Sequence, residues 1–141
     1  MPRIRIARTL LATAVALAAL PAGAQAATPR TLWRGTFASL GGHSISGTAK
    51  VVRLRDGRRR LVLRPFSTES GPDLRVWLVA GRVPVSGAVP SYRSVGRLAR
   101  TSGAQSYAIG RRVDLSRFKS VVVWCEDFSV AFGAARLARV R

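Results

Sequence analysis

Apolar and polar residues alternate along most of the chain after residue 30, and Gly, Pro and Ser separate the alternating runs. A period of two is typical of β-strands that bury one face, whereas a long helix would repeat every 3.6 residues. The pattern predicts strands over 33–39, 44–55, 60–66, 74–80, 105–109, 119–125 and 128–140.

Strands at this spacing predict an all-β fold, either an antiparallel β-sandwich or a flattened barrel of about seven or more strands. Residues 81–94 interrupt the pattern with two prolines and two glycines. Proline and glycine at this density indicate a long surface loop.

One hairpin can be predicted in detail over residues 51–66, because Asp56-Gly57 is a strong signal for a two-residue turn. That turn would pair Arg55 with Arg58 and Val52 with Leu61. It would place Val52, Leu54, Leu61 and Leu63 on the core face, and Arg53, Arg55, Arg58, Arg60 and Arg64 on the other face.

Like charges directly opposite one another destabilise a strand pair. Two interpretations of this arginine face follow. It is either a solvated surface whose charges are screened by salt, or a binding site for an anionic polymer or surface.

The N-terminus has the three parts of an export signal. Three arginines precede an apolar run over 9–20, and small residues follow up to Ala26. The run is shorter than the roughly 20 residues that span a bilayer, so no transmembrane span is expected in the mature protein. The sequence predicts a cleaved signal helix within residues 1–26, a single domain over 27–141, and export to a periplasm or the cell exterior.

The chain is strongly basic, with 24 Lys and Arg against 6 Asp and Glu, a formal net charge of +18. Removal of the three signal arginines leaves +15. This excess favours an anionic partner, although a general bias towards arginine would also scatter charges over the chain. The aromatic residues fall in strand patterns, so sequence-specific nucleic-acid recognition is not indicated.

Few catalytic constellations are available to a chain with one histidine and one cysteine. These counts exclude a His-Glu-x-x-His zinc site, a paired-cysteine zinc site and an intramolecular disulfide. No serine elbow with a histidine base and no glycine-rich phosphate loop is present. A redox or binding module is therefore favoured over a stand-alone enzyme.

The only cysteine lies in "VVVWCEDFSV" (121–130), at the end of a predicted strand. Alternation places Cys125 on one face with Val121 and Val123, and both faces of the strand are apolar, as in a central strand. Trp124 and Phe128 are predicted to lie in the core. Three roles remain open for Cys125, namely a buried structural residue, a redox residue or cofactor ligand, and the bridge of a covalent homodimer.

The chain resembles the DM-thirteen (DM13) domain family, an exported or cell-surface module described as an electron-transfer component. The resemblance covers about residues 33–139. It rests most specifically on Gly71-Pro72-Asp73-Leu74 and on the Val-Val-Trp-Cys-x-x-Phe-x-Val-x-Phe-Gly-x-Ala run that ends at Ala135.

The resemblance implies a redox role for Cys125, which matches the family's hallmark cysteine, with an unidentified redox or cell-envelope partner. It also implies haem as a possible cofactor held by the thiolate. His43 is the only imidazole that could serve as a second ligand or a proton acceptor, although its loop position is equally typical of a surface histidine without such a role. Phe118, Ala99-Arg100 and the longer 81–94 loop depart from the family pattern, and these departures concern the binding surface rather than the fold.

Overall fold

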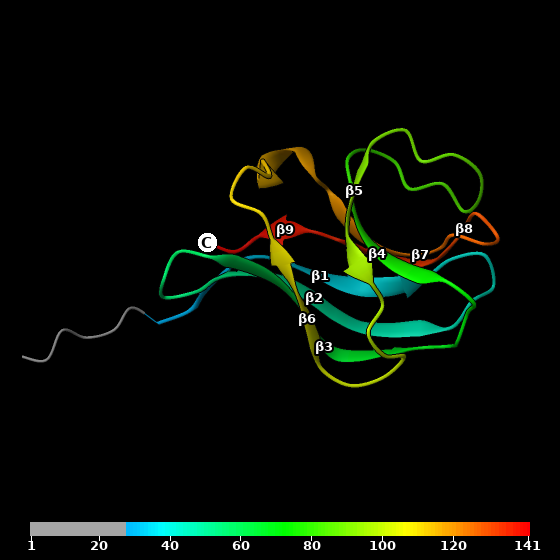
Figure 1. Ribbon diagram of the computed structural model, residues 1–141, viewed down its shortest axis with the longest axis horizontal. Coiled ribbons are helices and arrows are strands. Elements are labelled where there is room, and N and C mark those ends of the chain that lie inside the picture. The colour runs from blue at the N-terminus through cyan, green and yellow to red at the C-terminus, as the bar shows by residue number, and fades with distance from the viewer. Residues whose placement is uncertain (1–27) are drawn as a thin grey trace, which may run out of the picture.

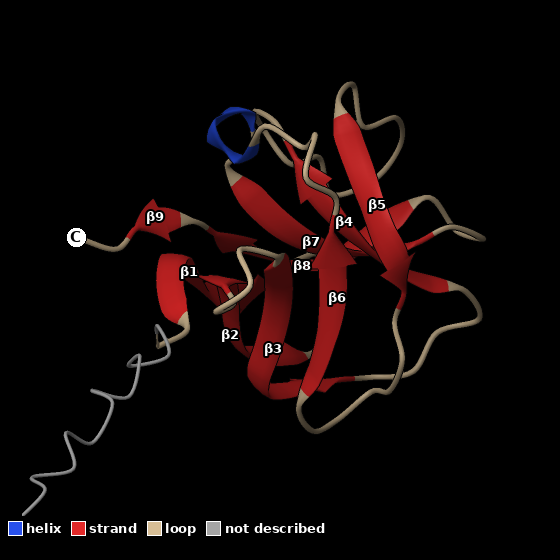
Figure 2. Cartoon of the chain, turned by 60° about the vertical axis from the view of Figure 1, so that its left-hand side comes forward, coloured by secondary structure: helices blue, strands red, loops and turns tan. Residues whose placement is uncertain are grey.

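The structure is a computed structural model that describes residues 28–141, so the predicted signal peptide over 1–26 lies outside the described residues. The described part is all-β (Figures 1 and 2). Its elements are β1 (Arg30–Ser39), β2 (Ile45–Arg53), β3 (Arg59–Thr68), β4 (Leu74–Val79), β5 (Tyr92–Arg97), β6 (Gln105–Ile109), the short 3-10 helix η1 (Leu115–Arg117), β7 (Ser120–Cys125), β8 (Val130–Arg136) and β9 (Ala138–Arg139).

The strands form one antiparallel sheet that curls into a nearly closed, flattened barrel. Their order is β5-β4-β7-β8-β1-β2-β3-β6, and β9 pairs with β1 outside this path. The end strands β5 and β6 meet where Gly96 approaches the ring of Tyr107, since a Cβ at Gly96 would lie 3.4 Å from that ring. The prediction of a flattened all-β barrel is confirmed, and residues 28–141 contain no helix long and apolar enough to cross a bilayer.

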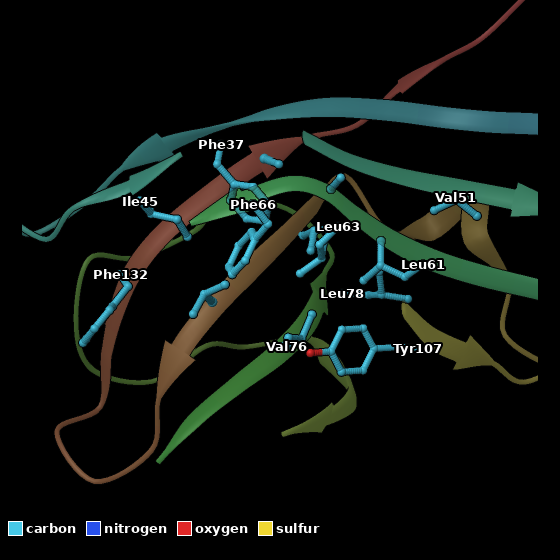
Figure 3. Close-up of a cluster of buried hydrophobic side chains, with 14 of the residues drawn as sticks. Phe37, Ile45, Val51, Leu61, Leu63, Phe66, Val76, Leu78, Tyr107 and Phe132 are labelled. Carbon is cyan, nitrogen blue, oxygen red and sulfur yellow. The ribbon is translucent and has the colours of Figure 1, made fainter. Parts of the chain in front are cut away.

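The barrel interior is filled from both layers (Figure 3). Phe37 and Phe66 meet edge to face, with ring centroids 5.5 Å apart. Val76 approaches from β4 in the opposite layer, and Tyr107 from β6, which pairs with β3. Leu61 is fully buried, and complete burial of a side chain of this size stabilises the fold by about 1.5–3 kcal/mol.

A second apolar cluster lies on the outer face of β4, β7 and β8. It contains Trp77, Val79, Val122, Trp124 and Ala131. The connection from β4 to β5, residues 80–91, passes over this face and covers it with Val83 and Val89. The segment predicted to be a surface loop is therefore largely exposed, but some of its side chains also cover the second apolar cluster.

The predicted register of the 51–66 hairpin is wrong by one residue. Val51, not Val52, pairs with Leu61, and Arg53 pairs with Arg59. The turn has three residues rather than two, because Gly57 adopts a left-handed φ of 82° and donates its N–H to the Leu54 carbonyl. Leu61 and Leu63 face the core as predicted, but β2 presents Ala49 and Val51 instead of Val52 and Leu54.

Two further differences concern strand number. β5 lies partly within the predicted 81–94 loop and was missed, because its side chains are mostly exposed and do not alternate. The predicted strand over 128–140 is divided into β8 and β9. β8 begins at Val130 and pairs with β7, whereas β9 pairs with β1.

Strand β1 joins the two halves of the barrel at a point of close contact with β8. A Cβ at Gly133 would lie 2.2 Å from Ile45 Cγ2 and 2.6 Å from the Ala38 carbonyl oxygen. No side chain fits there without moving β1 or β2. Glycine at position 133 therefore allows the sheet to continue from β8 to β1.

We expect Gly133→Ala to lower the free energy of unfolding by about 1–3 kcal/mol, the usual cost of overpacking a core. Gly110→Ala is the matched control, because its Cβ would lie 3.8 Å from the nearest atom. Urea denaturation of both variants measures the difference. Equal stabilities would contradict the importance of the close contact.

Candidate functional site

Cys125 is the last residue of β7, which lies between β4 and β8. It is opposite Leu74 on β4 and Val130 on β8, and its side chain belongs to the interior cluster. Its exposed fraction is 0%. The predicted alternation is confirmed, because Val123 also belongs to the interior cluster whereas Trp124 belongs to the outer one.

The turn over residues 126–129 follows Cys125 and connects β7 to β8. The N–H of Glu126 donates to the Asp73 carbonyl at 2.9 Å, which extends the pairing of β4 and β7 beyond Cys125. Phe128 lies at the turn and is 67% exposed. Its predicted core position is wrong, because β8 begins only at Val130 and the turn projects into solvent.

His43 lies at the same end of the barrel, in the turn between β1 and β2. Its ring stacks on Phe132 with centroids 3.9 Å apart and an interplanar angle of 9°, and its Nδ1 is bonded to the Glu69 carboxylate. The N–H of Glu69 also donates to the Ser44 carbonyl at 3.1 Å. The sequence did not single out Glu69 as a partner, because it is 26 residues away.

The geometry of Cys125 does not fit a haem ligand. A thiolate ligand needs one open side at which the iron can bind, but Cys125 has no exposed surface and lies among apolar side chains. His43 is engaged by Glu69 and Phe132. Residues 28–141 also contain no group of three or more His, Cys, Asp and Glu side chains that could hold a metal ion.

A cavity of about 290 Å³ opens near Cys125, between the turn before β4 and the segment after β5. Leu74, which is opposite Cys125 in the sheet, forms part of its wall. Arg97 and Arg100 line the other side. The two arginines therefore place positive charge at the opening of the cavity.

An ion-pair network fixes the rim of this cavity. Arg75 donates to both carboxylate oxygens of Asp73, at 2.8 and 3.0 Å, and Arg97 lies 3.3 Å from the same carboxylate. The hydrogen bonds from Arg75, with the positive charges of Arg75 and Arg97, lower the pKa of Asp73 below its usual value. Asp73 thus remains ionised and holds Arg97, which lines the cavity.

The five predicted anion-binding arginines are not on one sheet face. The one-residue shift places Arg53 opposite Arg59 and Arg60 opposite Val52. Their local partners also differ. Arg58 pairs with Asp56 at 2.6 Å, and Arg60 bonds to Ser106 Oγ. Arg64 is exposed on β3, and Arg55 lies in the turn.

The hairpin end nevertheless contains a basic hollow. A cavity of about 220 Å³ at this end is lined in part by Arg58, Arg59, Arg60 and Arg111. Arg59 donates to the carbonyls of Gly110 and Arg111, at 2.5 and 3.0 Å, which fixes its guanidinium at the rim. Two of these arginines, Arg59 and Arg111, had not been singled out from the sequence.

A column of aromatic rings was also missed from the sequence. Trp77 stacks on Tyr92 on one side and on Trp124 on the other. Tyr92 begins β5, which was predicted to be loop, so no sequence pattern placed it beside β4. The column lies on the outer face of the sheet, on the opposite side of β7 from Cys125.

The family model described as "Electron transfer DM13" matches residues 36–137 of this chain. The matched range includes His43, Cys125 and the complete aromatic column. No curated protein and no solved structure matches the chain.

We expect the Cys125 thiol to resist a chromogenic thiol reagent in the native protein and to react as one thiol per chain after denaturation, because the folded side chain is fully buried. The variant Ser102→Cys, at an exposed position, is the control and should show one rapidly reacting thiol. Rapid reaction of the native wild type would contradict the burial of Cys125.

Proposed function

Because this chain belongs to the electron-transfer DM13 family, we propose that it is an exported electron-transfer module in which Cys125 is the redox-active residue. The observation that supports the proposal is the position of Cys125. It is fully buried, but it lies at the end of its strand, opposite the Leu74 that lines a surface cavity.

Burial limits the chemistry that this thiol can perform. Thiol–disulfide exchange requires the disulfide of another molecule to reach the Cys125 sulfur atom, and a covalent homodimer requires the Cys125 sulfur of a second chain to reach it. Both are disfavoured for a side chain with no exposed surface. Electron transfer through the protein needs no such contact, so one-electron exchange is the mode that fits Cys125.

In this mode Cys125 gives one electron to a strongly oxidising one-electron acceptor, such as a metal centre on a partner protein. The thiol proton leaves at the same end of the barrel, to one of the exposed carboxylates that follow in the chain, Glu126 or Asp127. The product is a neutral thiyl radical. Return of one electron and one proton restores the thiol.

The cavity near Cys125 and the turn beside it are where we place the partner. Arg97 and Arg100 give the cavity mouth a positive charge, which favours an acidic partner surface. Phe128 adds an exposed aromatic side chain on the adjacent turn. Docking here would bring a redox partner close to Cys125 without opening the barrel.

Export is part of the proposal and rests on the basic and apolar pattern of residues 1–26. Expression with the native N-terminus tests it. A mature chain that begins at Ala27 and is recovered outside the cytoplasm would support export. An uncleaved chain inside the cell would contradict it.

The redox role predicts that a film of the mature protein gives a one-electron voltammetric wave, and that Cys125→Ser and Cys125→Ala both abolish it. Circular dichroism of both variants controls for folding, because serine introduces a buried hydroxyl and alanine a small cavity. An unchanged wave in either folded variant would exclude Cys125 as the redox residue.

The four arginines around the hairpin cavity favour a second candidate function, the binding of an anionic polymer or surface. Their charges converge on one hollow, and no carboxylate side chain lines it. Arg60 is also oriented by Ser106. In this function Cys125 serves only as packing, and replacing it would change stability without changing binding.

We expect Arg58→Ser/Arg60→Ser to elute from a heparin column at lower salt than the wild type, because two cations are removed from one hollow. Arg30→Ser/Arg34→Ser removes the same charge from β1 and is the matched control. Equal shifts for the two pairs would show that only net charge governs retention and would remove the hairpin site.

A further inference from the structure

Three aromatic rings form a continuous column on the outer face of β4, β5 and β7. The rings of Trp77 and Tyr92 have centroids 3.7 Å apart and an interplanar angle of 14°. Those of Trp77 and Trp124 have centroids 5.0 Å apart and an angle of 17°. The middle ring therefore contacts both of its neighbours with nearly parallel π-faces.

The column runs from solvent to the core of the sheet. Tyr92 is 47% exposed, whereas Trp77 and Trp124 are 3% and 2% exposed. Val83 and Val89, from the β4–β5 connection that arches over this face in Figure 1, cover the buried part. Trp124 directly precedes Cys125 in the chain, and the Cys125 side chain lies on the inner face of β7.

Trp77 has a feature that packing does not explain. Its indole N–H is buried and has no hydrogen-bond partner. A buried tryptophan normally finds an acceptor for this group, because leaving the donor unpaired loses its hydration without compensation. An indole without a proton acceptor keeps its N–H proton when it loses an electron, so its oxidised form is a radical cation.

We propose that Tyr92, Trp77 and Trp124 form an electron relay between the surface and the strand that carries Cys125. The relay deepens the proposed electron-transfer function and rests on it for its biological purpose. Contact between the rings allows an electron to pass along the column, and the covering loop keeps water from the two indoles.

The relay operates by single-electron steps. A one-electron acceptor removes an electron from Trp124. An electron then passes from Trp77 to oxidised Trp124, and another from Tyr92 to oxidised Trp77. The exposed phenol of Tyr92 releases its proton to water and becomes a neutral tyrosyl radical. In total the acceptor gains one electron, solvent gains one proton, and Tyr92 is the residue oxidised.

Tyr107 is the other tyrosine of the chain and is unsuited to this terminal role. Its hydroxyl is buried and donates to Gln105 Oε1 at 2.7 Å, and an amide oxygen does not take up the proton. Burial also raises the pKa of Tyr107. Tyr107 therefore serves as the control for Tyr92 within the same protein.

The test uses the full mature chain carrying Trp33→Phe and Cys125→Ser, so that both remaining tryptophans belong to the column and no thiol competes. If the serine variant does not fold, Cys125→Ala replaces it. A laser flash at the red edge of indole absorption ionises these tryptophans, and hexaamminecobalt(III) captures the ejected electron. Transient absorption follows the tryptophan and tyrosyl radicals.

We expect the tryptophan radical to decay as a tyrosyl radical forms. Tyr92→Phe should abolish the tyrosyl radical while preserving a stacked ring, and Tyr107→Phe should leave it unchanged. A tyrosyl signal that survives Tyr92→Phe, or a radical that stays on tryptophan in the parent protein, would overturn the relay. Because Cys125 is absent, neither result depends on its redox role, which voltammetry tests separately.

Discussion

The barrel depends on the close backbone contact of β1 with β8, because β1 is the strand through which the two halves of the sheet join. Its first part pairs with β2 and its last part with β8. At Gly35 a Cβ would lie 2.2 Å from the Arg136 carbonyl oxygen, and Gly133 is equally crowded. Two glycines thus let the sheet curl so that its inner faces cover one another. Burial of Cys125 follows from that closure.

Strand β7 serves two apolar layers at once. Its inward side chains complete the barrel interior, and its outward side chains pack beneath the β4–β5 connection. Adjacent residues therefore lie in different environments. Cys125 is sealed inside the barrel, while Trp124 belongs to a column that reaches the surface. The proposed redox residue and the proposed relay are consequently separated by one peptide unit, although their side chains point in opposite directions.

The few acidic residues organise turns more than they neutralise charge. Asp56 holds the β2–β3 turn through Arg58, Asp114 caps η1 through Ser116, and Asp73 holds two arginines beside the cavity near Cys125. The pKa values of all three carboxyl groups are lowered by hydrogen bonds from these neighbours. Most arginines are left to give the surface a positive field, which attracts anionic oxidants, polymers and acidic partners to either end of the barrel.

The sequence by itself determined the all-β class, most strand positions and the face that Cys125 shares with Val121 and Val123, because a period-two pattern follows from strand geometry alone. It did not determine the hairpin register, since Asp56-Gly57 suits both a two-residue and a three-residue turn. Nor could it place Tyr92 on Trp77 or His43 on Glu69. These contacts join segments that only the strand order brings together, and strand order depends on the packing of the whole barrel.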